Sequence, residues 1–257
     1  MEVLKDFKAI YSVVFKKTLI SYFKYIIMIP LMIVYASVYE VSKILLGISI
    51  GQLGSGGAFL AGISSWFIMS FILSDFLGHL DALIFNRKIS LNSLGSNRMT
   101  YFSSVLSATA IPNIVIYGLV ILLRIEIEPY WLYLFYLIYA VPEVIYQKQK
   151  DRTDIFIYGH HFIKENWLLW GVINLVFALS LFGIDQYFFA EFIVPRALTM
   201  IYSDMNVYIV SLFVQIMKWI VLSIPLMFVL IFRGYLFKIL SVSSKRKREY
   251  MRNIYGE

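Results

Sequence analysis

Residues 207–232 read VYIVSLFVQIMKWIVLSIPLMFVLIF, and this stretch decides the class of fold. It contains a single charged side chain, Lys218. An α-helix needs roughly 20 apolar residues to cross the ~30 Å hydrocarbon core of a bilayer. The stretch therefore predicts a transmembrane helix.

Five further apolar runs of similar length precede it, at about 20–41, 59–84, 101–123, 130–147 and 166–184. The whole chain is 60% hydrophobic and only 15% charged, whereas soluble domains are about 25% charged. We therefore predict an all-α, polytopic membrane protein with about six transmembrane helices, forming one domain over residues 1–257. The run at 130–147 is the shortest, with Pro142 and Glu143 near its end.

Basic residues are distributed unequally between the linkers. Four segments hold 19 of the 23 Lys and Arg residues: 1–24, 85–100, 148–165 and 233–257. An excess of Lys and Arg marks cytoplasmic loops. The pattern predicts a multi-pass protein of the cell (plasma) membrane with both termini in the cytoplasm.

Two stretches look amphipathic rather than spanning. Apolar residues recur at helical spacing in 1–17, interleaved with Lys, and 154–164 resembles it. Both are predicted to be interfacial helices. They also share a pattern, IYSVVFKK at 10–17 and IYGHHFIK at 157–164, which indicates either a parallel internal repeat or a chance match.

The tail, 241–257, is basic and is predicted to be cytoplasmic. Its contiguous charges would lie against anionic lipid or dock a partner: Lys245, Arg246, Lys247 and Arg248. The net charge of +7 is interpreted in the same way, as orientation plus attraction to anionic lipid at the cytoplasmic face, and no nucleic-acid partner is expected.

Charged side chains inside apolar runs are candidate sites, because charge is costly in hydrocarbon. Asp75 and His79 are one helical turn apart, and such a pair could bind a cation, relay a proton or simply tie helices together. Glu143 and His160 map to the same cytoplasmic side. The four residues could therefore converge on one inner-face site.

Lys218 is the candidate charge on the outer side. It would either snorkel to the outer interface or pair with an outer acid such as Asp185, Glu191 or Glu40. Two ligands alone do not make a metal site, so no metal is expected at Asp75 and His79.

Several kinds of chemistry have no support in the sequence. The chain has no Cys and only three His, which excludes disulfides, thiolate metal sites and a Cys nucleophile. It contains no Walker A, GxSxG or HExxH motif. We expect no cofactor and no catalytic residues.

Two resemblances follow from these features. The layout of an interfacial helix, six spans and internal termini resembles ABC-2-type permease subunits. The loop FNRKISLNSLGSNRMTYF at 85–102 is similar to the loop that such permeases present to their ATPase. That resemblance implies that Arg87, Lys88 and Arg98 contact a separate ATPase chain.

The second resemblance covers IYAVPEVIYQ at 138–147 and FIKENWLLW at 162–170. These segments look like small six-helix bacterial membrane proteins related to the membrane domain of glycerophosphodiester phosphodiesterases. This resemblance does not imply a catalytic role.

The expected function is that of a non-enzymatic, permease-like subunit of a transport or export system, forming an oligomer and driven by a separate partner. One alternative is a structural or assembly subunit of a membrane complex. The other is an inner-face, lipid-modifying enzyme that uses Asp75, His79 and Glu143.

Overall fold

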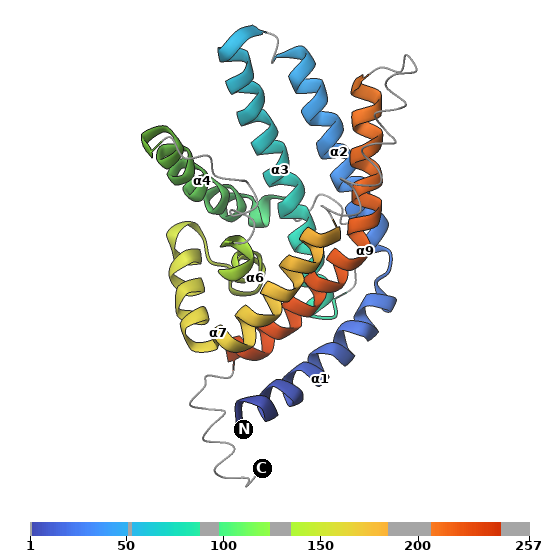
Figure 1. Ribbon diagram of the computed structural model, residues 1–257, viewed down its shortest axis with the longest axis vertical. Helices are drawn as coiled ribbons and strands as arrows, with labels where there is room; N and C mark the ends of the chain where they lie inside the picture. Colours follow the sequence, from blue (N-terminus) through green and yellow to red (C-terminus); the bar gives the residue numbers. More distant parts are fainter. Residues whose placement is uncertain (1, 51–52, 88–97, 124–134, 185–206, 243–257) are drawn as a thin grey trace.

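The computed structural model describes residues 2–50, 53–87, 98–123, 135–184 and 207–242 (Figure 1). Within these ranges the long elements are all helices and no strand occurs. The helices are α1 (Glu2–Lys24), α2 (Met28–Ser49), α3 (Gly54–Ile84), α4 (Arg98–Leu123), α6 (Val141–Lys148), α7 (Arg152–Gly183) and α9 (Val207–Val242).

Four helices are long and apolar enough to cross a membrane: α2, α3, α7 and Ile209–Val242 of α9. The prediction of an all-helical protein with membrane-spanning helices is therefore confirmed in the described residues. Four of the six predicted spans are supported, and the count of six stays a prediction. Helix α4 occupies the third predicted run, at 101–123. The cell membrane as the location and the orientation of the termini stay predictions.

The fourth predicted run, 130–147, is not one continuous helix. Its described part is broken at Ala140, which has a left-handed φ of 51°, and α6 then runs for only eight residues. Pro142 explains the break, because it has no N–H to donate to the carbonyl of Ile138. Residues 130–134 lie outside the described part of the chain.

The first predicted span also begins later than expected, at Met28 rather than near residue 20. Pro30 falls in the first turn of α2, where its missing N–H costs least. The chain therefore turns at 25–27, and everything before the turn forms the separate helix α1.

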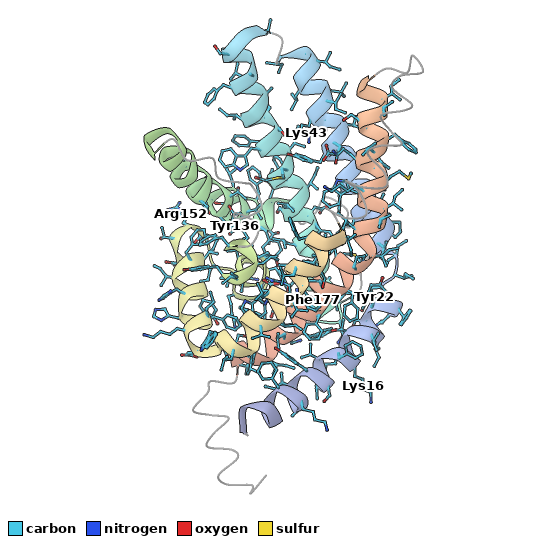
Figure 2. The ribbon with its side chains drawn as sticks, in the orientation of Figure 1. Lys16, Tyr22, Lys43, Tyr136, Arg152 and Phe177 are labelled. Carbon is cyan, nitrogen blue, oxygen red and sulfur yellow. The ribbon has the colours of Figure 1, made fainter. Side chains whose placement is uncertain are left out.

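Helix α1 lies along α9 at one end of the molecule (Figure 1). Tyr22 bonds the carbonyl of Ile224 at 3.2 Å and Tyr11 bonds the carbonyl of Leu169 at 2.5 Å, whereas Lys16 points away from the bundle (Figure 2). The helix over 1–17 is thus present as part of α1. Its place at the membrane interface stays a prediction.

Helix α7 is kinked at Asn166, whose backbone is not helical (φ −127°, ψ 16°). The side-chain amide of Asn166 donates to the Phe162 carbonyl at 3.0 Å. The first piece of α7 contains the predicted interfacial segment 154–164, and the second piece matches the fifth predicted span, 166–184.

Helix α9 is central, because it packs against α1, α2, α3, α6 and α7. The core gathers around its second half: Leu80, Ile84, Tyr146, Trp170, Ile231 and Phe237. The first half of α9 and the upper parts of α2 and α3 rise from this core (Figure 1). Large apolar side chains there are exposed, including Val34, Leu45 and Leu60, as expected for helices in contact with lipid.

Candidate functional site

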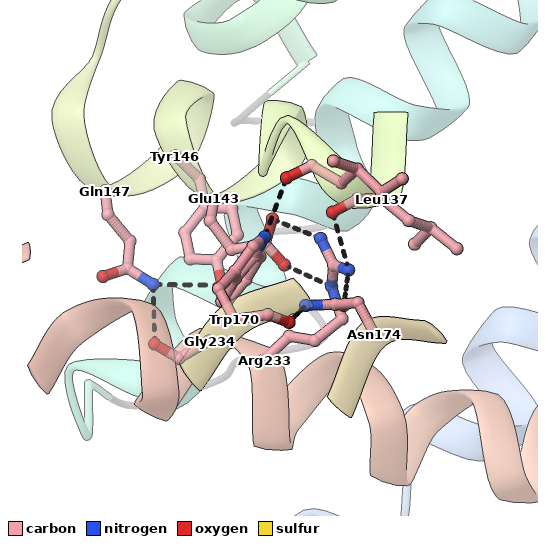
Figure 3. Close-up of polar contacts among 9 residues, drawn as sticks. Leu137, Glu143, Tyr146, Gln147, Trp170, Asn174, Arg233 and Gly234 are labelled. Atoms are coloured by element: carbon pink, nitrogen blue, oxygen red, sulfur yellow. Dashed lines mark hydrogen bonds and ion pairs between the residues drawn. The ribbon is translucent and has the colours of Figure 1, made fainter. Parts of the chain in front are cut away.

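Among the residues that the structure describes, Arg233 on α9 stands out for the number of hydrogen bonds that its side chain makes. Its side chain is fully buried and grips the carboxylate of Glu143 on α6 with two parallel bonds, Nε to Oε1 and Nη2 to Oε2, each 2.8 Å (Figure 3). Nη1 donates to the Leu137 carbonyl at 3.0 Å and to Oδ1 of Asn174. Bidentate Arg–carboxylate pairs of this kind are strong and geometrically specific.

These contacts supply hydrogen-bond donors where the helix is interrupted at Ala140. The carbonyls of Leu137 and Ile138 lose their usual helical donors there. Arg233 donates to the first, and Nε1 of Trp170 donates to the second at 2.8 Å. The Trp170 ring also lies 4.7 Å from the guanidinium carbon, a cation–π contact. We call this group the Arg233 junction: Arg233, Glu143, Asn174, Trp170 and the carbonyls of Leu137 and Ile138.

Close packing holds the junction in place. A Cβ at Gly234 would meet Ile84 Cδ1 and the Tyr146 hydroxyl, both at 2.6 Å. The carbonyl of Gly234 accepts a 2.9 Å bond from Nε2 of Gln147 (Figure 3). A larger residue at this position would force the ends of the Ile84 and Tyr146 side chains to shift.

A second polar feature runs along α3. Ser65 donates to the Tyr39 hydroxyl of α2 at 3.4 Å, and Trp66 Nε1 donates to Thr109 of α4 at 2.7 Å. Ser70 and Ser74 follow, both fully buried. We call Ser65, Trp66, Ser70, Ser74, Asp75, His79 and Asp81 the α3 polar row. It covers about 24 Å of helix, and its members lie on more than one face of α3, since Ser65 bonds α2 and Trp66 bonds α4.

Asp75 and His79 lie in the C-terminal half of this row. The Asp75 carboxylate is fully buried and accepts a 2.5 Å bond from the Tyr35 hydroxyl of α2. His79 is 1% exposed, and its Nε2 has no hydrogen-bond partner. An imidazole nitrogen is always a donor or an acceptor, so a buried, unbonded one is an unmet requirement of this arrangement.

The structure does not bring all four predicted inner-face residues into one buried group. Asp75, His79 and Glu143 are buried, whereas His160 lies exposed on α7 beside His161, on the side opposite to Gly159 and Phe162. Within the described part of the chain, no three His, Asp or Glu side chains are grouped so as to hold a metal ion.

The outer candidates are only partly described. Lys218 is half-buried on α9, and Asp185 lies outside the described residues. Glu40, an acid considered as its partner, forms a 2.8 Å ion pair with Lys43 on its own helix.

Among the candidate partner contacts, Arg87 is largely exposed and pairs with Asp81 at 2.9 Å. Arg98 begins α4, but its side chain is not described. The remaining candidates lie outside the described residues: Lys88, Lys245, Arg246, Lys247 and Arg248.

Sequence reasoning found Glu143 but missed Arg233, which was grouped with the basic cytoplasmic residues. A signal was present, because Arg233 is followed by the largely apolar residues GYLFKIL at 234–240. An arginine with apolar residues on both sides requires a buried acceptor. Glu143, inside the fourth apolar run, was the matching acid.

Comparison of the chain with protein-family models, with curated proteins and with solved structures finds no match. The functional argument therefore depends on the geometry of the two polar groups.

Proposed function

We propose that this chain is the non-enzymatic membrane subunit of a transport or export system, powered by a separate partner protein. In this proposal the α3 polar row lines the route taken by a polar substrate or ion. The observation that carries it is the row itself: polar side chains recur along a helix long enough to span a membrane. Polar and ionisable groups at such depth mark pathways or pair with one another.

If the polar row only held helices together, each of its buried polar atoms would have a partner, and at His79 one atom does not. Ser65, Trp66 and Asp75 have partners on neighbouring helices. Nε2 of His79, by contrast, has none in this packing. An unbonded buried group is expensive to keep, so a purely structural role does not account for it.

The enzymatic alternative requires a free carboxylate at Glu143, and that carboxylate is already bonded. Both carboxylate oxygens of Glu143 accept bonds from Arg233, in a buried pair. A carboxylate held in this way is committed to the packing of α6 and α9. This argues against Glu143 as a general acid or base.

The assembly alternative has one observation in its favour. The most apolar parts of α2 and α3 have only 11% of their residues buried inside the chain. Those faces are available to lipid or to other subunits, and a scaffold would use them for subunits.

Cysteine accessibility separates these proposals, because the natural chain has no Cys. Ser70→Cys and Ser74→Cys place a thiol in the row, whereas Phe67→Cys and Leu73→Cys place one on exposed apolar positions of the same helix. Because Ser70 and Ser74 are fully buried in this packing, a charged, membrane-impermeant thiol reagent should label the first two in nanodiscs only when the helices move apart to open the row, and it should spare the second two. Protection of all four from the reagent would make the row a dry structural contact.

The partner is tested separately, by purifying the tagged full chain from native membranes in mild detergent. An ATPase subunit recovered at fixed stoichiometry supports the transport proposal. Recovery in a fixed assembly without any nucleotide-binding subunit would favour the scaffold.

A further inference from the structure

We propose that His79 is a proton-responsive contact: the packed arrangement of α3 against α2 holds its imidazole neutral, and protonation favours a state in which α3 and α2 separate near Asp75. This inference deepens the proposed function by naming a proton as the coupling ion. Its test reads the distance between helices and not transport.

The argument begins with the unbonded nitrogen. Nε2 of His79 is buried and has no partner in the packed state. A neutral imidazole with one unbonded nitrogen already costs free energy, and the cost rises on protonation because both ring nitrogens of an imidazolium are donors. Protonation would therefore leave a charged N–H without an acceptor in a low-dielectric interior, where the cost is greatest.

The neighbouring charges do not remove this cost. The charged and titratable side chains of the packed helices near this end of α3 are Tyr35 on α2, Tyr101 on α4, Glu143 and Tyr146 on α6, and Arg233, Tyr235 and Lys238 on α9. Glu143 and Arg233 neutralise each other. Lys238 donates to the carbonyl of Ile84, and Tyr235 bonds Ser21.

Asp75 lies one helical turn before His79, on the same side of α3. Its carboxylate attracts an imidazolium. Protonation of His79 is therefore favoured once water can solvate the Nε2–H group. The open state therefore binds more protons than the packed state. Lowering the pH must then favour opening, by the ordinary linkage between proton binding and conformation.

Spin labels can read the separation of the two helices. Val38→Cys on α2 and Phe67→Cys on α3 are at exposed positions, and the chain offers no competing thiol. Distances between the labels are measured by pulsed electron resonance on the full chain in nanodiscs, at about pH 8 and about pH 5, the range in which imidazole titrates. A control pair, Phe15→Cys on α1 with Leu175→Cys on α7, should not respond.

We expect the ratio of longer to shorter distances to rise about fivefold or more at the lower pH, a coupling of ordinary size. In the His79→Gln variant the ratio should stay constant. Distributions that are identical at the two pH values in the natural sequence, or an equal response in His79→Gln, would overturn the proposal.

A second variant keeps the test open if His79→Gln does not fold. Asp75→Asn retains an oxygen that can accept from Tyr35, but it removes the attraction for an imidazolium. The midpoint of the distance change should move to lower pH, and an unchanged midpoint would contradict the role of the pair. Because neither readout involves a substrate or an ATPase, failure here leaves the transport proposal standing.

Discussion

The Arg233 junction and the C-terminal half of the α3 polar row differ in how completely their buried polar groups are hydrogen-bonded. At the junction, the guanidinium makes two parallel bonds to the Glu143 carboxylate, and its Nη1 donates to a backbone oxygen and an amide oxygen. In the row, Asp75 has the Tyr35 hydroxyl, but Nε2 of His79 has no partner. The junction is satisfied in one geometry, whereas a change in the packing around His79 would allow its Nε2 to form a hydrogen bond.

The Arg233 junction is therefore expected to stay rigid, whereas the region around His79 is expected to change its packing. A bonded buried pair resists movement, because breaking it strands a charge. A buried group with an unmet bond is already destabilising, so hydrating it offsets part of the cost of moving its neighbours apart, which here includes the bond between Tyr35 and Asp75. The following predictions test how far this division holds.

The largest effect is expected at the junction itself. Arg233→Met and Glu143→Met each leave one buried charge without its partner and should each cost about 3–5 kcal/mol of folding free energy. The double variant should cost much less than the sum, because no charge remains. SDS titration in mixed micelles, followed by far-ultraviolet circular dichroism, gives the free energies for this cycle. Additive costs would show that the pair is not coupled.

An intermediate effect is expected from close packing beside the junction. Gly234→Ala places a methyl group 2.6 Å from Ile84 Cδ1 and the Tyr146 hydroxyl, which should cost about 1–3 kcal/mol. Gly171→Ala is the matched control, because no atom lies within 4 Å of its new methyl group. That change should be neutral or should stabilise the helix by up to about 1 kcal/mol. Equal effects in the two variants would mean that α9 is not tightly held.

The smallest effect comes from Thr18, whose hydroxyl is the other buried side-chain atom without a partner in the described residues. Thr18→Val keeps the shape and removes the unmet hydroxyl, so the protein should gain up to about 1 kcal/mol. Ser21→Ala loses the 2.7 Å bond with Tyr235 and should cost about 1 kcal/mol. A loss in Thr18→Val would reveal a bond that forms in the membrane.

The apolar runs predicted most of the long helices, because hydrocarbon demands an unbroken stretch of the right length. The end of the second run coincides with the end of α3 at Ile84. The fourth run was misjudged, because its composition is apolar while Pro142 divides its backbone. The apolar composition of a segment indicates that it is surrounded by hydrocarbon or protein. Whether its helix is continuous depends on residues such as Pro142, which lack a backbone N–H.

The candidate site was predicted in part. Asp75 and His79 were recognised from their spacing on one helix, which is a local property. The Glu143–Arg233 pair joins two distant parts of the chain, and no local pattern specifies such a contact. The burial of Arg233 also depends on Gly234, whose significance appears only once α3, α6 and α9 are packed.

The separation of Glu143 and Arg233 by 90 residues has a consequence for assembly in the cell. A chain is made from its N-terminus, so the Pro-broken segment and its acid leave the ribosome long before α9 exists. Until α9 is inserted, the carbonyl of Leu137 and the Glu143 carboxylate lack the donors that Arg233 supplies. Residues 135–148 therefore reach their final packing only after α9 is in place, so α9 completes a segment that was synthesised well before it.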